Sequence, residues 1–196
     1  MQKANFRTVF SLVFGVILVW GVSAQTGGGK TKAFFDILNS GTYHMKTRMV
    51  VSKSGEMAME TYSKDGKIAT ATTSQGMSFR VVVKDDKTYT IIDAAKMIMV
   101  SPVQKGKDTG RIQTNGMKFT GSGTADFNGK KLPYEEYSDS KGNKAQLFLD
   151  GSKLAGIRNI MGKEQILDMI IDLLDQNVPA SVFDLPSGYK MQEKAN

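Results

Sequence analysis

Residues 42–51 read TYHMKTRMVV, a stretch in which apolar and polar side chains alternate. Tyr43, Met45, Met49 and Val51 occupy positions of one parity. Side chains two residues apart on a β-strand point to the same face of the sheet. The alternation continues, strand after strand, up to about residue 100. It predicts an antiparallel sheet with one apolar face.

Methionine fills an unusual share of these apolar positions. Met57 and Met59 share a parity in the second run, and Met97 and Met99 share one in a later run. Methionine side chains are flexible and polarisable, so a face made of them suits a ligand of variable shape such as a lipid chain. The same property makes methionine a good filler of an ordinary core. The pattern alone leaves both interpretations open.

The first 24 residues have the layout of a secretory signal peptide. Lys3 and Arg7 make a basic start, residues 9–21 are apolar except for one serine, and residues 22–24 are small enough for a signal peptidase. The apolar run is shorter than the roughly 20 residues of a membrane-spanning helix. An uncleaved membrane anchor is the alternative. We therefore expect cleavage before Gln25 and a periplasmic or otherwise exported protein that is soluble afterwards.

Residues 25–31 are glycine-rich and predict a flexible lead-in, which leaves residues 32–196 as a single domain. The chain has no cysteine, so core packing rather than disulfides must hold the domain together. Its 26 Lys and Arg against 19 Asp and Glu make a mild basic excess, without clusters of basic and aromatic residues. We expect no nucleic-acid partner and, at most, peripheral contact with a membrane.

Turn signals punctuate the chain at intervals of about ten residues, a spacing typical of a meander of hairpins. They include Asp65-Gly66, Asp85-Asp86, Asn128-Gly129 and Asp150-Gly151. Such dipeptides supply the positive φ angles of tight hairpins. We count about ten strands, which is enough to curl a sheet into a barrel or to bend it strongly.

Two helices are expected. Residues 31–39 place Phe34 and Leu38 on one face and are followed by Gly41. Residues 163–176 carry a wide apolar stripe opposite four acidic residues, which predicts an amphipathic helix lying over the concave side of the sheet. The predicted fold is therefore α+β and mainly antiparallel β, a strongly curved open half-barrel of about ten strands covered by one or two helices.

Catalytic motifs are absent from the sequence. His44 is the only histidine, which excludes a catalytic triad or a histidine-rich metal site of the usual kind, and we expect it on a polar face. Glu135 and Glu136 are adjacent on a predicted strand, so they point to opposite faces and cannot flank one glycosidic bond. We therefore expect a protein that is not an enzyme and has no cofactor or resident metal.

Copper binding is a lesser alternative. Met57, Met59, Met97 and Met99 form two Met-x-Met pairs, and thioethers are soft ligands that suit Cu(I). Both sulfurs of each pair would share a face of the sheet. The methionines are scattered along the chain, however, which favours a core or a lipid-contacting lining.

The order of elements and four local stretches resemble the outer-membrane lipoprotein carrier and receptor superfamily, the LolA/LolB-like proteins. The stretches are residues 41–48 (GTYHMKTR), 84–93 (KDDKTYTIID), 132–137 (LPYEEY) and 178–189 (VPASVFDLPSGY), of which the last is the most distinctive. The resemblance covers most of residues 31–191. It implies an open, curved antiparallel half-barrel closed by helices, with an apolar cavity for acyl chains.

The sequence departs from this family at two points. No proline follows Arg80, so the Arg-Pro pair of the carriers is missing, and the lipid-bearing cysteine of the receptors is missing too. The resemblance thus implies the fold and the cavity rather than lipoprotein sorting itself.

We predict a non-enzymatic binding protein of the cell envelope that holds a lipid, an acyl chain or a lipidated partner in the apolar concave face. The alternative is an interaction or stress-sensing module whose interior is filled and which binds an envelope protein. The residues expected to contact the ligand are Met45, Met49, Met57, Met59, Phe79, Val81, Met97, Met99, Ile166, Ile170 and Leu173.

Overall fold

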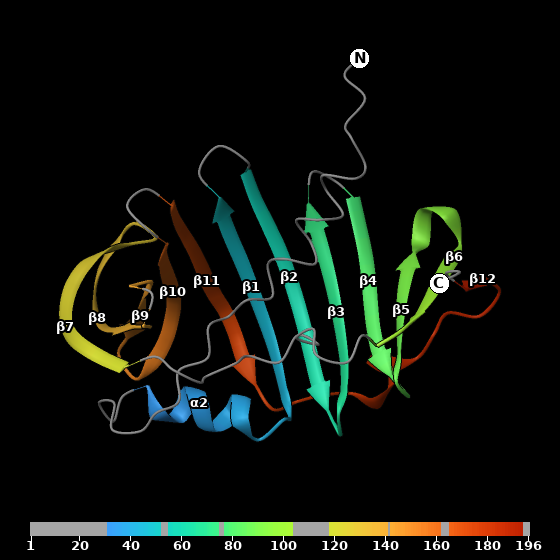
Figure 1. The fold of residues 1–196 in the computed structure, drawn as a ribbon, viewed down its shortest axis with the longest axis horizontal. Helices are drawn as coiled ribbons and strands as arrows, with labels where there is room; N and C mark the ends of the chain where they lie inside the picture. Colours follow the sequence, from blue (N-terminus) through green and yellow to red (C-terminus); the bar gives the residue numbers. More distant parts are fainter. Residues whose placement is uncertain are drawn as a thin grey trace, which may run out of the picture.

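The computed structural model describes residues 31–51, 55–74, 77–103, 118–140, 142–161 and 165–193. These residues form one open sheet of twelve strands in the order β12-β6-β5-β4-β3-β2-β1-β11-β10-β9-β8-β7 (Figure 1). All its strand pairs are antiparallel except β12 with β6. The signal peptide predicted for residues 1–24, like nearly all of the predicted lead-in, lies outside the described residues.

Two meanders build the sheet and meet at its centre. The first runs outward through β1 (Tyr43–Val51), β2 (Gly55–Lys64), β3 (Lys67–Ser74), β4 (Met77–Lys84), β5 (Lys87–Ile92) and β6 (Met97–Pro102). The second starts at the far edge and returns through β7 (Lys118–Phe127), β8 (Lys130–Ser138), β9 (Lys144–Asp150), β10 (Lys153–Met161) and β11 (Gln165–Asp175). Because β11 pairs with β1, the two halves of the chain share one continuous sheet.

The first predicted helix is present as α2 (Lys32–Asn39), below β10, β11 and β1 in Figure 1. Its Phe34, Phe35 and Leu38 are buried in a core cluster with side chains of β1, β2 and β8–β11. Gly41, at a φ of +73°, allows the chain to turn from the helix into β1. We call the side of the sheet on which α2 packs the helix face, and the other side the opposite face.

Three of the predicted turns have two successive residues at positive φ, as tight hairpins require. The angles are 51° and 74° at Asp65-Gly66, 52° and 55° at Asp85-Asp86, and 48° and 72° at Asn128-Gly129. Asp85-Asp86 adopts this backbone without a glycine, which aspartate tolerates better than most residues. The turn residues therefore set the register of these three hairpins.

The prediction of a helix over residues 163–176 is wrong. Most of this segment forms β11, which lies between β1 and β10 near the middle of the sheet. A central strand that is covered on both faces carries apolar residues without alternation. Met169 on the helix face and Ile170 on the opposite face are both buried. The apolar run therefore belongs to a two-sided strand rather than to the stripe of a helix.

The acidic residues that mimic the polar side of a helix are cross-strand partners of basic side chains. Asp168 binds Arg158 of β10 and Asp172 binds Arg48 of β1, each through two hydrogen bonds of 2.8–2.9 Å. Asp172 is the extra residue of a β-bulge, because Ile171 and Leu173 pair with consecutive residues of β1. The bulge shifts the parity of the strand, so Asp168 and Asp175, which are seven positions apart, both lie on the opposite face.

The rest of the predicted fold is confirmed in outline. The sheet is open and mainly antiparallel with a helix, but it has twelve strands rather than about ten, and no second α-helix covers it within the described residues. After β11 the chain forms the 3₁₀-helix η2 (Ala180–Phe183) and then β12 (Lys190–Glu193) at the sheet edge. Val178 and Phe183 are buried against the opposite face of β3–β6.

The β7–β8 hairpin bends over its neighbours, and a glycine makes this possible. The ring of Phe127 in β7 stacks on Phe148 in β9 at a centroid distance of 4.3 Å. The same ring lies directly over Gly156 in β10, where an added Cβ would overlap the ring and the carbonyl oxygen of Met169. A residue without a side chain is therefore required at position 156.

We expect Gly156→Ala to lower the free energy of unfolding by about 1–3 kcal/mol, because a backbone oxygen and a buried ring must both move to admit a methyl group. Gly121→Ala is the matched control, since a Cβ at Gly121 of β7 meets nothing within 4 Å. Urea denaturation of both variants measures the difference. Equal midpoints for the two variants would show that the hairpin is not packed as described.

Candidate functional site

The strand register brings eight of the predicted contact residues onto the helix face. They are Met45, Met49, Met57, Met59, Phe79, Val81, Met97 and Met99. One row of paired residues crosses six adjacent strands, and it consists of Met45, Thr61, Thr70, Val81, Thr90 and Met99. These eight side chains share a face as the alternation predicts, while their contact with a ligand stays a prediction.

The helix face has two regions that differ in what covers them. Beneath α2, Met45, Met49 and Met59 are at most 7% exposed and belong to the same cluster as the helix. They are core residues there. On β4–β6 the side chains of this face, such as Phe79, Val81 and Met99, are only partly buried except for Thr90. Among the described residues no helix or other segment is packed in a core cluster on this region. We call the helix face of β3–β6 the open strip.

Threonines form the floor of the open strip, and the sequence reasoning missed them. Thr70, Thr72 and Thr90 are each at most 8% exposed. Larger apolar residues stand beside them in the register, since Thr72 pairs with Phe79 and Thr90 pairs with both Val81 and Met99. Alternating threonines in IATATT, residues 68–73, were the signal that could have identified this floor.

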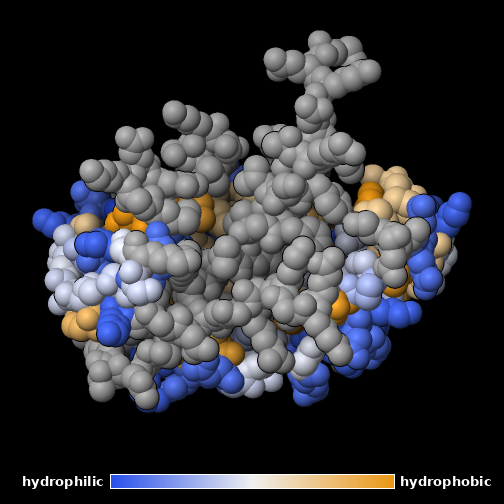
Figure 2. Space-filling model, viewed as in Figure 1, coloured by the Kyte–Doolittle hydropathy of each residue, from blue (hydrophilic) through white to orange (hydrophobic). Residues whose placement is uncertain are grey.

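An open pocket of about 310 Å³ lies at one end of the open strip. Ile68, Val83 and Val103 form its apolar wall, and Gly66 and residues 84–86 of the neighbouring turns complete it. Ile68 and Val83 are a register pair two residues from the pair Thr70 and Val81, so the pocket continues the strip along β3 and β4. In Figure 2, hydrophilic side chains line the lower rim, where these turns lie.

Two predicted contact residues do not reach this face. Ile170 pairs with Arg48 and Leu173 pairs with Lys46, which puts both on the opposite face. Ile170 is buried there with Phe127 and Phe148. Ile166 lies in β11, but its side chain is outside the described residues. The expectation that a helix of residues 163–176 covers the methionines is wrong, because residues 165–175 form a strand within the sheet.

The four-methionine copper site is contradicted by the strand order. Met57 and Met59 lie on β2, whereas Met97 and Met99 lie on β6, and three strands separate β2 from β6. Four inter-strand spacings amount to about 19 Å along the sheet. The two pairs therefore do not form one site.

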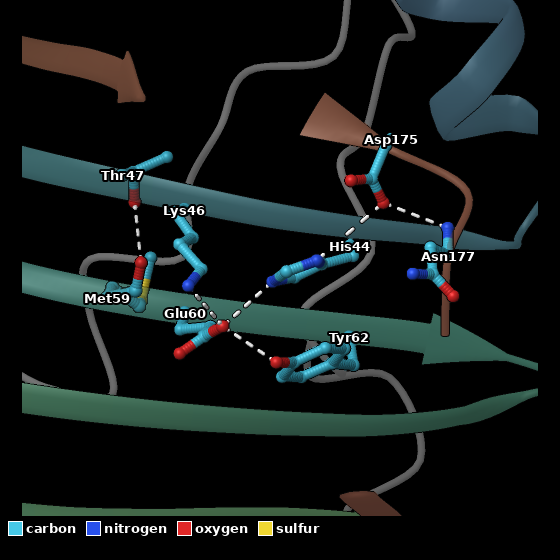
Figure 3. A network of polar contacts seen from close by, with 8 residues as sticks. All are labelled: His44, Lys46, Thr47, Met59, Glu60, Tyr62, Asp175 and Asn177. Atoms are coloured by element: carbon cyan, nitrogen blue, oxygen red, sulfur yellow. Dashed lines mark hydrogen bonds and ion pairs between the residues drawn. The ribbon is translucent and has the colours of Figure 1, made fainter. Parts of the chain in front are cut away.

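A polar network occupies the opposite face where β1, β2 and β11 meet (Figure 3). The His44 ring stacks on Tyr62 with the centroids 4.2 Å apart, and its Nε2 lies 2.8 Å from Glu60 Oε1. On its other side, Nδ1 lies 3.6 Å from Asp175 Oδ1. The Tyr62 hydroxyl donates a hydrogen bond of 2.7 Å to Glu60, and Lys46 lies 3.1 Å from the same carboxylate.

The network shifts two pKa values in opposite directions. Burial acts to raise the pKa of Glu60, but hydrogen bonds from Tyr62, His44 and Lys46 outweigh it and hold this pKa below its usual range. Burial, followed by the hydrogen bond to Glu60, raises the pKa of Tyr62 to about 12. His44 is thus a polar residue of a strand face, as predicted, and it joins three strands that come from both meanders.

The adjacent carboxylates of β8 lie on opposite faces, as predicted. Glu135 is buried on the helix face, where Thr31 donates a hydrogen bond of 2.6 Å and Tyr137 one of 3.0 Å to the same oxygen. Glu136 faces the other way and binds Lys144 and Gln146, each at 2.9 Å. The role of Glu135 is to tie the start of α2 to the sheet, which the sequence did not reveal.

Two other features are absent from the described residues. No group of three or more His, Asp or Glu side chains in them could hold a metal ion. The helical part of the described chain contains no segment both long and apolar enough to cross a membrane.

Comparison with known proteins bears on the fold alone. No family model and no curated protein matches the sequence. The fold is similar to that of an uncharacterized conserved protein from Thermus thermophilus, with 8% identity and a TM-score of 0.55 over 84% of this chain and 99% of that one. A LolA superfamily protein from Nitrosomonas europaea is similar with 8% identity and a TM-score of 0.40, over 77% and 97% of the two chains.

We expect Glu60→Gln to lower the free energy of unfolding by about 1 kcal/mol at neutral pH. The Glu60 carboxylate interacts with His44, Tyr62 and Lys46, and solvent partly screens these interactions. A carboxylate whose pKa is lowered by folding stabilises the fold above its unfolded pKa. That contribution is lost as the pH falls through the folded value. The free energies of unfolding of the wild type and the variant should therefore become equal below about pH 4.

Urea unfolding at neutral pH and at about pH 3 measures this difference. Asp150→Asn is the control, because the Lys130–Asp150 pair is exposed on both sides and should contribute less than about 0.5 kcal/mol. If Glu60→Gln still lowers the free energy of unfolding in acid, packing rather than charge accounts for its effect.

Proposed function

We propose that this chain binds a lipid or an acyl chain on the open strip, as a non-enzymatic carrier-type protein. The observation that carries the proposal is the contrast between the two regions of the helix face. The chain fills the region beneath α2 with its own core, but leaves the side chains of Phe79, Val81, Met97 and Met99 only partly buried on the open strip.

The shape and chemistry of the open strip suit a flexible apolar ligand. Threonines supply a low floor with methyl groups, and Met97 and Met99 on β6 can adjust to the ligand. Burial of one methylene contributes about 0.8 kcal/mol, so about ten methylenes would outweigh the cost of ordering the ligand. The pocket with Ile68, Val83 and Val103 on one wall and Lys84, Asp85 and Asp86 beside them lies at one end of the strip.

The sequence adds two further reasons. Its resemblance to the LolA/LolB-like proteins implies an apolar cavity for acyl chains, and the N-terminal segment has the layout of a secretory signal. We therefore place the carrier in the cell envelope, with a lipid or a lipidated protein as its cargo. Fractionation of cells that express the full chain tests this location, and recovery only from the cytosol would contradict it.

A protein-interaction module is the second candidate. One half of the helix face is already a filled core around Met45, Met49 and Met59, which is what such a module would show. The two candidates differ in the open strip, because a module has no need of partly exposed apolar side chains there. Binding of a fatty acid therefore discriminates between them.

We expect the protein without residues 1–24 to bind a fatty acid that carries an anthroyloxy fluorophore, and Val81→Asp to weaken this binding at least about ten-fold. Val81 sits in the middle of the row that crosses the strip, so a carboxylate there would need to be desolvated beside the acyl chain. Fluorescence titration measures the affinity.

Ser78→Asp is the matched control, since Ser78 is exposed on the opposite face of the same strand and should leave the affinity unchanged. Met99→Gln, which keeps the side-chain size, provides a second variant should Val81→Asp fail to fold. Absence of fatty-acid binding, together with no lipid in native mass spectra of protein purified from its own envelope, would overturn the proposal.

A further inference from the structure

Within the described part of the chain, the edge strand β12 is held by little besides its backbone pairing with β6. It has four residues, and all four side chains are exposed, Met191 to 58%. It is the one parallel strand of the described sheet, with Lys190 paired to Met97 and Glu193 to Val100. The amide of Lys190, the first residue of β12, donates a hydrogen bond of 2.9 Å to the carbonyl of Lys96, the residue that precedes β6.

The segment before β12 is anchored independently of it. Phe183 is buried on the opposite face, and its carbonyl accepts a hydrogen bond of 2.9 Å from Lys84. Tyr189 packs on the same cluster and its hydroxyl donates a hydrogen bond of 3.0 Å to Asp93. The anchoring contacts end at Tyr189, so β12 can leave the edge without loss of a buried side chain.

The side chains of β12 are poorly matched to the edge they cover. Lys190 and Gln192 pair with Met97 and Met99, and neighbours in register lie on the same face of a sheet. Two polar side chains therefore stand beside two apolar ones, and the methionines stay partly buried. A strand with apolar residues at these two positions would cover the methionines better.

We propose that β12 is an exchangeable cap, and that the β6 edge binds an extended peptide segment of a partner protein in its place. The preferred peptide has apolar residues at the positions of Lys190 and Gln192, where they meet Met97 and Met99. It has an acidic residue at the position of Glu193, whose carboxylate lies 4.0 Å from the Lys87 ammonium group. Backbone pairing supplies the affinity, and the alternate side chains supply the selectivity.

This surface adjoins the acyl-chain site and shares Met97 and Met99 with it, but it uses the backbone of the sheet edge rather than the floor of the open strip. The competing explanation is a fixed cap that only hides a sheet edge from aggregation. The two differ in whether the β6 edge can be vacated, so the test compares a locked cap with a loosened one.

The locked variant carries Met99→Cys with Gln192→Cys. These residues are partners in the register, and paired strands are close enough for a disulfide. The chain has no other cysteine, so the crosslink is unambiguous. The loosened variant is Gln192→Pro, which removes a backbone donor from the strand. Both changes are made in the chain without residues 1–24.

The probe is a fluorescein-labelled peptide of residues 188–193 that carries Lys190→Val and Gln192→Val. We expect the Gln192→Pro variant to bind it at least ten-fold more tightly than the oxidised locked variant, and reduction of the disulfide to restore binding. The peptide with the native residues should bind several-fold more weakly than the valine peptide.

Hydrogen exchange supplies a second measurement that does not depend on the loosened variant. Amides of residues 190–193 should exchange at least a hundred-fold faster than those of β5 in the unmodified chain. The proposal is overturned by equal peptide binding to the locked and loosened variants, by no binding to either, or by β12 amides as protected as those of β5.

Discussion

The pairing of β1 with β11 is the contact on which the rest of the molecule depends. It joins the last strand of one meander to the first strand of the other, across 124 residues of sequence between Arg48 and Asp172. On the helix face Met49 pairs with Met169 beneath α2, and on the opposite face Arg48 holds Asp172 at 2.8 Å. Without this pairing there would be two separate hairpin sheets, each with an uncovered edge.

The two faces of the sheet are covered on different halves, one on each side of this junction. α2 lies over the helix face of the second meander and the junction, while η2 and its flanking residues lie over the opposite face of the first meander. Each covering segment brings its own phenylalanines, Phe34 and Phe35 from one and Phe183 from the other. Among the described residues, no covering segment is packed in a core cluster on the helix face of β3–β6 with its threonine floor.

Much of the strand pattern could be predicted because it is local. Alternation placed Met45, Phe79, Val81 and Met99 on one face, and the register agrees because side-chain direction in a strand has a period of two. The turn at Asp85-Asp86 was predictable because few residues tolerate positive φ. The sequence did not predict which segment of the chain covers each part of the sheet. Whether a methionine lies beneath a helix or on an open strip depends on a segment elsewhere in the chain.

The sequence by itself determined the strands of the two meanders except β11, the tight turns and the short first helix, since each follows from neighbouring residues and their backbone preferences. Only the tertiary structure decided the nature of residues 165–175. Their apolar run and spaced aspartates fit a helix equally well, until Arg48 and Arg158 on neighbouring strands supplied partners for the carboxylates and both faces of the strand were covered. Strand order likewise separated the two methionine pairs. The physical reason is the same in both cases, because burial and pairing are properties of residues that meet in space and not of residues that follow one another in the chain.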